Sequence, residues 1–129
     1  MTNNEAVIID SSSWIEAFRA GGNASTTQRV QSLVRSGRAG WCEIIRLELW
    51  RGIRDDAEEE AMERLEKVVV NFPTDSLAWE RALRLGRVAL ENGLRPPPAD
   101  IVIMATAGRY GLSVDHQDRH LTKLEALKL

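Results

Sequence analysis

Short apolar runs alternate along this chain with longer segments that have helical periodicity. The first run, residues 7–9, has no polar position inside it, which is typical of a strand buried on both faces of a parallel sheet. Residues 38–42, 70–72 and 112–115 are the other candidate strands. Helical spacing predicts helices over residues 14–20, 25–36, 43–54, 55–69, 75–92 and 99–110, and a last one from about residue 121. Strands that alternate with helices indicate an α/β fold with a parallel sheet.

Glycine and proline mark where several of these helices end or begin. Gly37, Gly93 and Gly111 each follow a predicted helix, where a glycine can adopt the left-handed conformation that closes the last turn. The prolines at 96–98 precede a helix and restrict where it begins. This run is too short to be an interdomain linker, and no internal repeat is visible, so residues 1–129 are expected to form a single domain.

The composition is ordinary for a globular protein, with 43% hydrophobic and 28% charged residues. The single cysteine, Cys42, excludes an internal disulfide and suits a reducing compartment. Neither a signal peptide nor an apolar run near the roughly 20 residues of a membrane span is present. We therefore expect a soluble cytoplasmic protein. The formal net charge of −2 gives no basic field that would by itself indicate nucleic acid, although 14 of the 17 basic residues are arginines, which suit phosphate contacts.

Asp10 is the first candidate for chemistry, because it directly follows the first predicted strand. In parallel sheets, ligands bind just beyond the carboxyl ends of the strands. Three hydroxyl residues, at 11–13, come next in the chain. An alternative interpretation is that Asp10 or Ser12 only caps the helix that follows.

Glu48 lies in the middle of a predicted helix, on the same face as Ile44 and Ile45. A carboxylate among inward-facing isoleucines is unfavourable unless a cation or a hydrogen-bond donor meets it. An ion pair with Arg51, one turn further on, is the structural alternative.

Two more acidic residues occur near the carboxyl-terminal end of the chain. Asp100 opens a helix whose apolar stripe contains Ile103, Met104 and Ala107, although first-turn acids are also common for electrostatic reasons. Asp118 follows the last predicted strand in the segment VDHQDRHL. Loop aspartates are usually solvated, so Asp118 alone carries little information.

Together, these four acids predict a divalent cation site. If they converge, their mutual repulsion has to be offset by a cation or by protonation, so at least one of them should have a raised pKa without metal. Carboxylate oxygens suit Mg²⁺ or Mn²⁺. Such ions orient and acidify water and stabilise charge on a phosphate, which indicates phosphodiester hydrolysis.

The sequence also resembles the PIN-domain nucleases, and among them the VapC-type toxins of bacterial toxin–antitoxin pairs. The resemblance runs from about residue 7 to 124 and is carried, in order, by VIIDSSSWIE, EIIRLELWRGI, FPTDSLAWERALRLG, PPADIVIMATA and LSVDHQDRHL. It implies a three-layer α/β/α fold with a short central parallel sheet of four to five strands. The family's acidic quartet would correspond to Asp10, Glu48, Asp100 and Asp118. Ser12 would be the small polar residue that helps to position the first carboxylate.

The resemblance further implies an endoribonuclease that uses Mg²⁺ or Mn²⁺ and cleaves structured RNA such as tRNA or rRNA. It implies a homodimer that is inhibited by a VapB-type antitoxin. The shortness of the apolar runs separately predicts that the protein does not associate with a membrane. Arg51 and Arg119 are candidates for holding flanking phosphates. The alternatives are a PIN nuclease of RNA processing that is not a toxin and a non-catalytic module that binds RNA or protein.

The last motif departs from the family pattern. His116 stands where the family often has Thr or Ser, and His120 stands at an acidic position. This leaves Asp115 as an alternative fourth acid, although Asp118 is favoured. A zinc site that uses the two histidines is a further, weaker interpretation, because no third nitrogen or sulfur ligand is apparent. The four tryptophans suit base stacking or antitoxin binding, but their positions favour packing.

Overall fold

A computed structural model describes residues 5–129 of the protein. Four parallel strands form one sheet in the order β3-β2-β1-β4. The strands are β1 (Val7–Ile9), β2 (Ala39–Trp41), β3 (Val70–Asn71) and β4 (Val114–Asp115). In the register of the central strand β1, Ile8 lies between Gly40 of β2 and Val114 of β4. The expected parallel sheet is therefore confirmed, with four strands.

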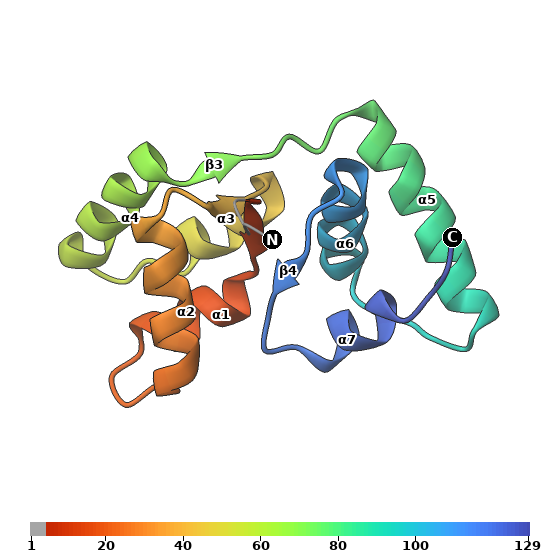
Figure 1. Ribbon diagram of the computed structural model, residues 1–129. Helices are drawn as coiled ribbons and strands as arrows, with labels where there is room; N and C mark the ends of the chain where they lie inside the picture. Colours follow the sequence, from red (N-terminus) through yellow and green to blue (C-terminus); the bar gives the residue numbers. More distant parts are fainter. Residues whose placement is uncertain (1–4) are drawn as a thin grey trace.

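Seven helices flank the sheet in residues 5–129: α1 (Ser11–Phe18), α2 (Ala24–Arg35), α3 (Glu43–Arg51), α4 (Asp56–Val68), α5 (Ser76–Glu91), α6 (Pro98–Tyr110) and α7 (Arg119–Glu125). Figure 1 shows α1, α2 and α4 on one side of the molecule and α5, α6 and α7 on the other, with β1 and β4 between them. This arrangement agrees with the expected three-layer α/β/α fold. No helix in the described part of the chain combines the length and the apolar character that a membrane crossing requires.

Two predicted helix starts are wrong, and capping carboxylates explain both differences. The first helix begins at Ser11 because Asp10 accepts a hydrogen bond from the backbone N–H of Ser12 at 3.1 Å. The last helix begins at Arg119 because Asp118 caps it in the same way. The predicted helix stop at Gly111 is confirmed, since this residue has a φ of 67° in the left-handed region.

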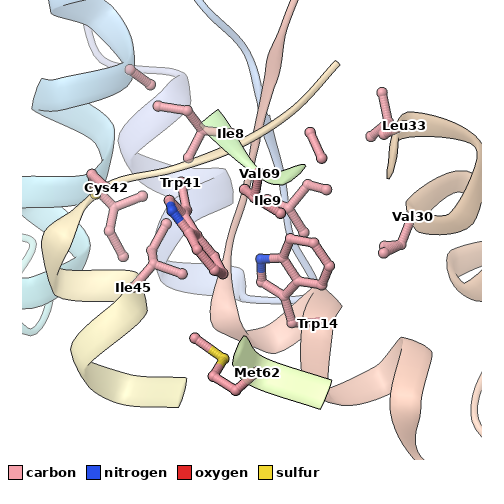
Figure 2. Packing of buried hydrophobic residues seen from close by; sticks show 13 residues of the cluster. Ile8, Ile9, Trp14, Val30, Leu33, Trp41, Cys42, Ile45, Met62 and Val69 are labelled. Atoms are coloured by element: carbon pink, nitrogen blue, oxygen red, sulfur yellow. The ribbon is translucent and has the colours of Figure 1, made fainter. Parts of the chain in front are cut away.

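The larger hydrophobic core lies around β1 and β2 and draws side chains from α1, α2, α3, α4 and α6. Trp14 and Trp41 are its largest members, both essentially without solvent exposure, and their ring centroids are 5.9 Å apart. Figure 2 shows the two indole rings next to each other. Trp50 is partly buried and donates its ring N–H to Glu66. Packing is thus confirmed for three tryptophans, whereas Trp79 is 51% exposed on α5.

A second core joins α5, α6 and α7. The small side chains of Ala82 and Ala89 let α5 approach α6 closely, and Leu121 and Leu124 anchor α7 against this pair. Because α6 and α7 carry Asp100 and Asp118 at their amino-terminal ends, this core fixes where those two carboxylates lie.

Candidate active site

Asp10 lies directly after β1 and is only 3% exposed. Both the backbone N–H and the hydroxyl of Ser12 donate to the same Asp10 oxygen, Oδ2. The capping interpretation is therefore correct. It does not exclude a second role, because the carboxylate stands at the carboxyl end of the central strand, where α/β proteins place ligands.

Glu48 reaches the start of α1 from α3. Its Oε1 accepts a hydrogen bond from the Ser11 hydroxyl at 3.1 Å. Within residues 5–129, Glu48 forms no ion pair with Arg51, so the structural alternative for this carboxylate is wrong. Burial raises the pKa of Glu48, and the charges of Asp10 and Asp118 add to this effect, while the Ser11 hydroxyl and Arg51 oppose it.

Asp100 lies in the first turn of α6 and is 9% exposed. Its Oδ2 is fully buried and has no hydrogen-bond partner in the described part of the chain. Burial, and then the charges of Asp118, Asp10 and Glu48, raise its pKa to about 6, although His120 acts in the opposite direction. A buried carboxylate oxygen without a donor is costly for a protein to retain.

Asp118 caps α7 and accepts a hydrogen bond from the backbone N–H of His120 at 2.7 Å. The loop before it is connected to the start of α1, because the backbone N–H of Gln117 donates to the Ser12 hydroxyl oxygen at 2.9 Å. Ser12 thus bridges the Asp10 carboxylate and the loop that carries Asp118.

Three of the four acids lie at helix amino termini: Asp10 at α1, Asp100 at α6 and Asp118 at α7. The positive end of each helix dipole partly offsets the repulsion among the carboxylates. Within residues 5–129, no three His, Cys, Asp or Glu side chains are close enough to share one metal ion. The charges of Asp10, Asp118 and Glu48 nevertheless act on Asp100, and those of Asp10 and Asp118 act on Glu48.

This donor set fits a hard divalent cation. All four side chains offer carboxylate oxygens, which Mg²⁺ and Mn²⁺ prefer. The buried Asp100 Oδ2 has no donor from the described chain, and burial followed by the charges of the other three acids raises the pKa of Asp100.

Asp115 has a different environment. The Ser13 hydroxyl donates to it at 2.8 Å, and Arg29 binds both of its oxygens, with Nε 2.9 Å from Oδ2. Burial opposes its ionisation, but the hydrogen bonds from Arg29 and Ser13 prevail and lower the pKa of Asp115. Because Asp115 already has a cationic partner, it is a poor alternative to Asp118 as the fourth acid.

The zinc interpretation of the histidines is wrong. His116 accepts a hydrogen bond at Nδ1 from the backbone N–H of Asp118 and pairs through Nε2 with Glu125. With both ring nitrogens engaged, His116 has none left for a metal. Sequence reasoning missed these two contacts of His116. It also missed the hydrogen bond between Ser11 and Glu48, although the run of three serines at 11–13 was a visible signal for it.

Comparison with known proteins places this architecture in a family. The model of the PIN domain matches residues 7–127. Ribonuclease VapC11 of Mycobacterium tuberculosis is 30% identical over 116 residues, which cover 87% of this chain and 86% of that protein. The chain belongs to the PIN-domain family.

Solved structures agree with the PIN-domain assignment at the level of the fold. The DNA-bound VapBC structure from Salmonella typhimurium superimposes with a TM-score of 0.75 at 17% identity and covers 96% of each chain. VapBC-5 from Mycobacterium tuberculosis, a member of the VapBC family of toxin–antitoxin systems, gives a TM-score of 0.68 at 22% identity and covers 94% of this chain and 91% of that one.

Proposed function

We propose that this PIN-domain protein is an endoribonuclease toxin of the VapC type that depends on Mg²⁺ or Mn²⁺. Asp10, Glu48, Asp100 and Asp118 would hold the metal. The observation that carries the proposal is the buried Asp100 Oδ2, which has no donor in the described chain and lies in the field of the other three acids. The curated relative named ribonuclease VapC11 supports RNA as the substrate.

A bound divalent cation would supply Lewis acidity and a more acidic water for attack on a phosphodiester. The protein's own contribution is to hold the ligands in place. Ser12 fixes the Asp10 carboxylate, and Ser11 does the same for Glu48. With a pKa of about 6 in the metal-free protein, Asp100 takes up a proton at its carboxylate in mildly acidic solution. This proton would be lost when a cation binds.

The substrate would be a structured RNA such as tRNA or rRNA. Arg51 follows Glu48 by three residues on α3, and Arg119 follows Asp118 directly at the start of α7. Both are therefore anchored beside proposed metal ligands. Their guanidinium groups would hold the phosphates that flank the scissile bond, which positions the RNA without reading its sequence.

An antitoxin of the VapB type would bind a groove formed by α1, α3 and α4. The groove has a volume of about 650 Å³. Its apolar lining includes Ile15 and Phe18, which are 57% and 62% exposed, and Arg19 and Arg54 lie at its margin. Both arginines already form ion pairs with neighbouring glutamates. The exposed apolar lining suits the apolar face of an amphipathic helix. The toxin–antitoxin assignment of VapBC-5 supports such a partner.

The decisive experiment compares the Asp100→Asn variant with the wild type in RNA cleavage at saturating Mg²⁺. Loss of a metal ligand should reduce cleavage at least about 100-fold, because even outer-shell partners of metal sites contribute 10- to 100-fold. The Glu91→Gln variant, which changes an exposed acid at the end of α5, is the matched control and should retain full activity.

Retained cleavage by the Asp100→Asn variant, with contaminating nuclease excluded, would refute the metal assignment. Failure of the wild type to bind Mg²⁺ or Mn²⁺ at millimolar concentration would favour the non-catalytic module. Growth arrest on expression, relieved by a small protein encoded next to this gene, would separate a toxin from a PIN nuclease of RNA processing.

A further inference from the structure

Asp118 differs from the two other acids at helix amino termini in how its backbone is held. The N–H of Asp10 donates to a carbonyl oxygen of β4 at 2.9 Å, and the N–H of Asp100 donates to the carbonyl oxygen three residues before it at 3.0 Å. The N–H of Asp118 donates instead to a side chain, at Nδ1 of His116, over 3.2 Å. Of these three acids, therefore, only Asp118 has a backbone N–H whose partner a substitution can remove.

His116 takes the place of an acceptor that α7 itself does not offer. In a capping box, a Glu or Gln at the third helical position accepts a hydrogen bond from the N–H of the capping residue. The third residue of α7 is Leu121, whose side chain has no acceptor. The imidazole of His116 supplies the missing acceptor from the loop before the helix. Because a backbone N–H can only donate, Nδ1 is unprotonated and the ring proton is on Nε2.

Glu125 holds the other side of the His116 ring. The protonated Nε2 donates to Oε1 of Glu125, which lies at the carboxyl-terminal end of α7. The His116 side chain is only 10% exposed, so little water is available to replace this partner. Hydrogen bonding at one ring nitrogen decides which tautomer the imidazole adopts. The Glu125 carboxylate therefore favours the tautomer in which Nδ1 is free to accept from Asp118.

We propose that His116 and Glu125 are positioning residues for Asp118, with Glu125 acting through His116. The inference rests on the proposed metal site, in which Asp118 is a ligand. The same loop is fixed on its other side, because the backbone N–H of Gln117 donates to Ser12 of α1. His116 stands where the family often has Thr or Ser, and such a hydroxyl can accept from the N–H two residues further on. A hydroxyl has no tautomers, so only the imidazole needs a partner like Glu125.

Amide hydrogen exchange of the metal-free full chain tests the hydrogen bond itself. His116→Val and His116→Thr introduce side chains of similar shape, of which only Thr carries an acceptor. In His116→Val, we expect the Asp118 amide to exchange at least about tenfold faster than in the wild type, because its partner is lost. In His116→Thr, the exchange rate of this amide should stay within about threefold of the wild type. Circular dichroism of both variants should match that of the wild type.

Calorimetric titration with Mn²⁺ and RNA cleavage at saturating metal test the consequence for the site. His116→Val should bind Mn²⁺ at least about tenfold more weakly and lower kcat by a similar factor, because support behind a metal ligand is lost. KM for RNA should stay nearly unchanged, since His116 does not contact the substrate in this role. His116→Thr should keep both the Mn²⁺ affinity and kcat within about threefold of the wild type.

Glu125→Ala tests whether Glu125 acts through His116. It should weaken Mn²⁺ binding about three- to tenfold in the wild-type background and have no effect in the His116→Thr background, where no tautomer has to be set. Glu91→Ala, which removes an exposed acid at the end of α5, is the matched control and should change neither background. An equal loss from Glu125→Ala in both backgrounds would overturn the proposed link.

Two outcomes separate a failure of the positioning role from a failure of the proposed function. Wild-type amide exchange and Mn²⁺ affinity in His116→Val, in a protein that binds Mn²⁺, would overturn the positioning role alone. A wild type that binds neither Mn²⁺ nor Mg²⁺ would overturn the proposed function together with the role of His116 in it.

Discussion

Asp100 and Asp115 are two shielded carboxylates of one small domain, and their surroundings change their acidity in opposite directions. The Asp115 side chain is 11% exposed and is bound by Arg29 and Ser13, so its pKa falls. Asp100 is 9% exposed, has an oxygen without a donor and lies among other acids, so its pKa rises to about 6. Similar burial thus yields a structural ion pair in one place and a carboxylate with an unpartnered oxygen in the other. The difference lies in the partners that the fold supplies.

The first test of this contrast replaces each of the two acids separately with asparagine, which is neutral. Asp115→Asn should keep RNA cleavage within about threefold of the wild type, whereas Asp100→Asn should lose it. The Asp115 variant should instead lower the free energy of unfolding by about 1–2 kcal/mol. The substitution removes the charge from the acceptor of the Arg29 and Ser13 hydrogen bonds, and water around the partly exposed Arg29 replaces only part of the lost interaction. Urea unfolding at pH 7 and a cleavage assay on both variants measure this contrast.

The stability difference for Asp115→Asn should also depend on pH. The folded-state pKa of Asp115 is lowered, so its stabilising contribution is present above the unfolded value of about 4 and disappears as the pH falls through the folded value. A loss of cleavage equal to that of Asp100→Asn would contradict the separation of the two acids.

The second prediction concerns metal and pH together. Because the pKa of Asp100 rises from 3.8 to about 6 on folding, the metal-free protein should lose stability as the pH increases between these two values. Asp100→Asn should remove this loss and be more stable than the metal-free wild type at pH 7.5 by up to about 1 kcal/mol, after allowance for solvent screening.

A divalent cation offsets the destabilising charge of Asp100 only at pH values at which Asp100 is ionised. Mg²⁺ or Mn²⁺ should therefore raise the melting temperature of the wild type more at pH 7.5 than at pH 5. The shift should be much smaller for Asp100→Asn at either pH. Thermal scans with and without millimolar metal measure it, and equal shifts at both pH values would argue against convergence of the four acids on one ion.

The smallest expected effect concerns the support of the site. Ser12→Ala removes the hydroxyl that donates to Asp10 and accepts from the Gln117 N–H. We expect cleavage to fall about three- to tenfold and the free energy of unfolding to fall by about 1 kcal/mol or less. Ser12→Thr keeps the hydroxyl and should retain most of the activity. Identical kinetics for the Ala and Thr variants would show that this bridge does not position Asp10.

The regular elements were largely predictable because their signals are local. The apolar run at residues 7–9 is the central strand, and Ala78, Ala82, Leu85 and Ala89, with helical spacing, form the buried face of α5. The errors fall at the starts of α1 and α7. At both places, an acid that is also a candidate metal ligand caps the helix, and the helix therefore begins directly after that acid.

The candidate site was predictable only as a set of residue types. The sequence by itself determined that acids follow β1, open α6, precede α7 and interrupt an apolar face of α3, since burial patterns are encoded in residue order. Only the tertiary structure decided that Arg29 pairs with Asp115, that Ser11 binds Glu48 and that Asp100 has an oxygen without a donor. Each of these outcomes depends on which side chains from distant segments meet. Contacts between side chains from distant segments depend on how the elements pack, and the order of residues along the chain does not reveal this packing.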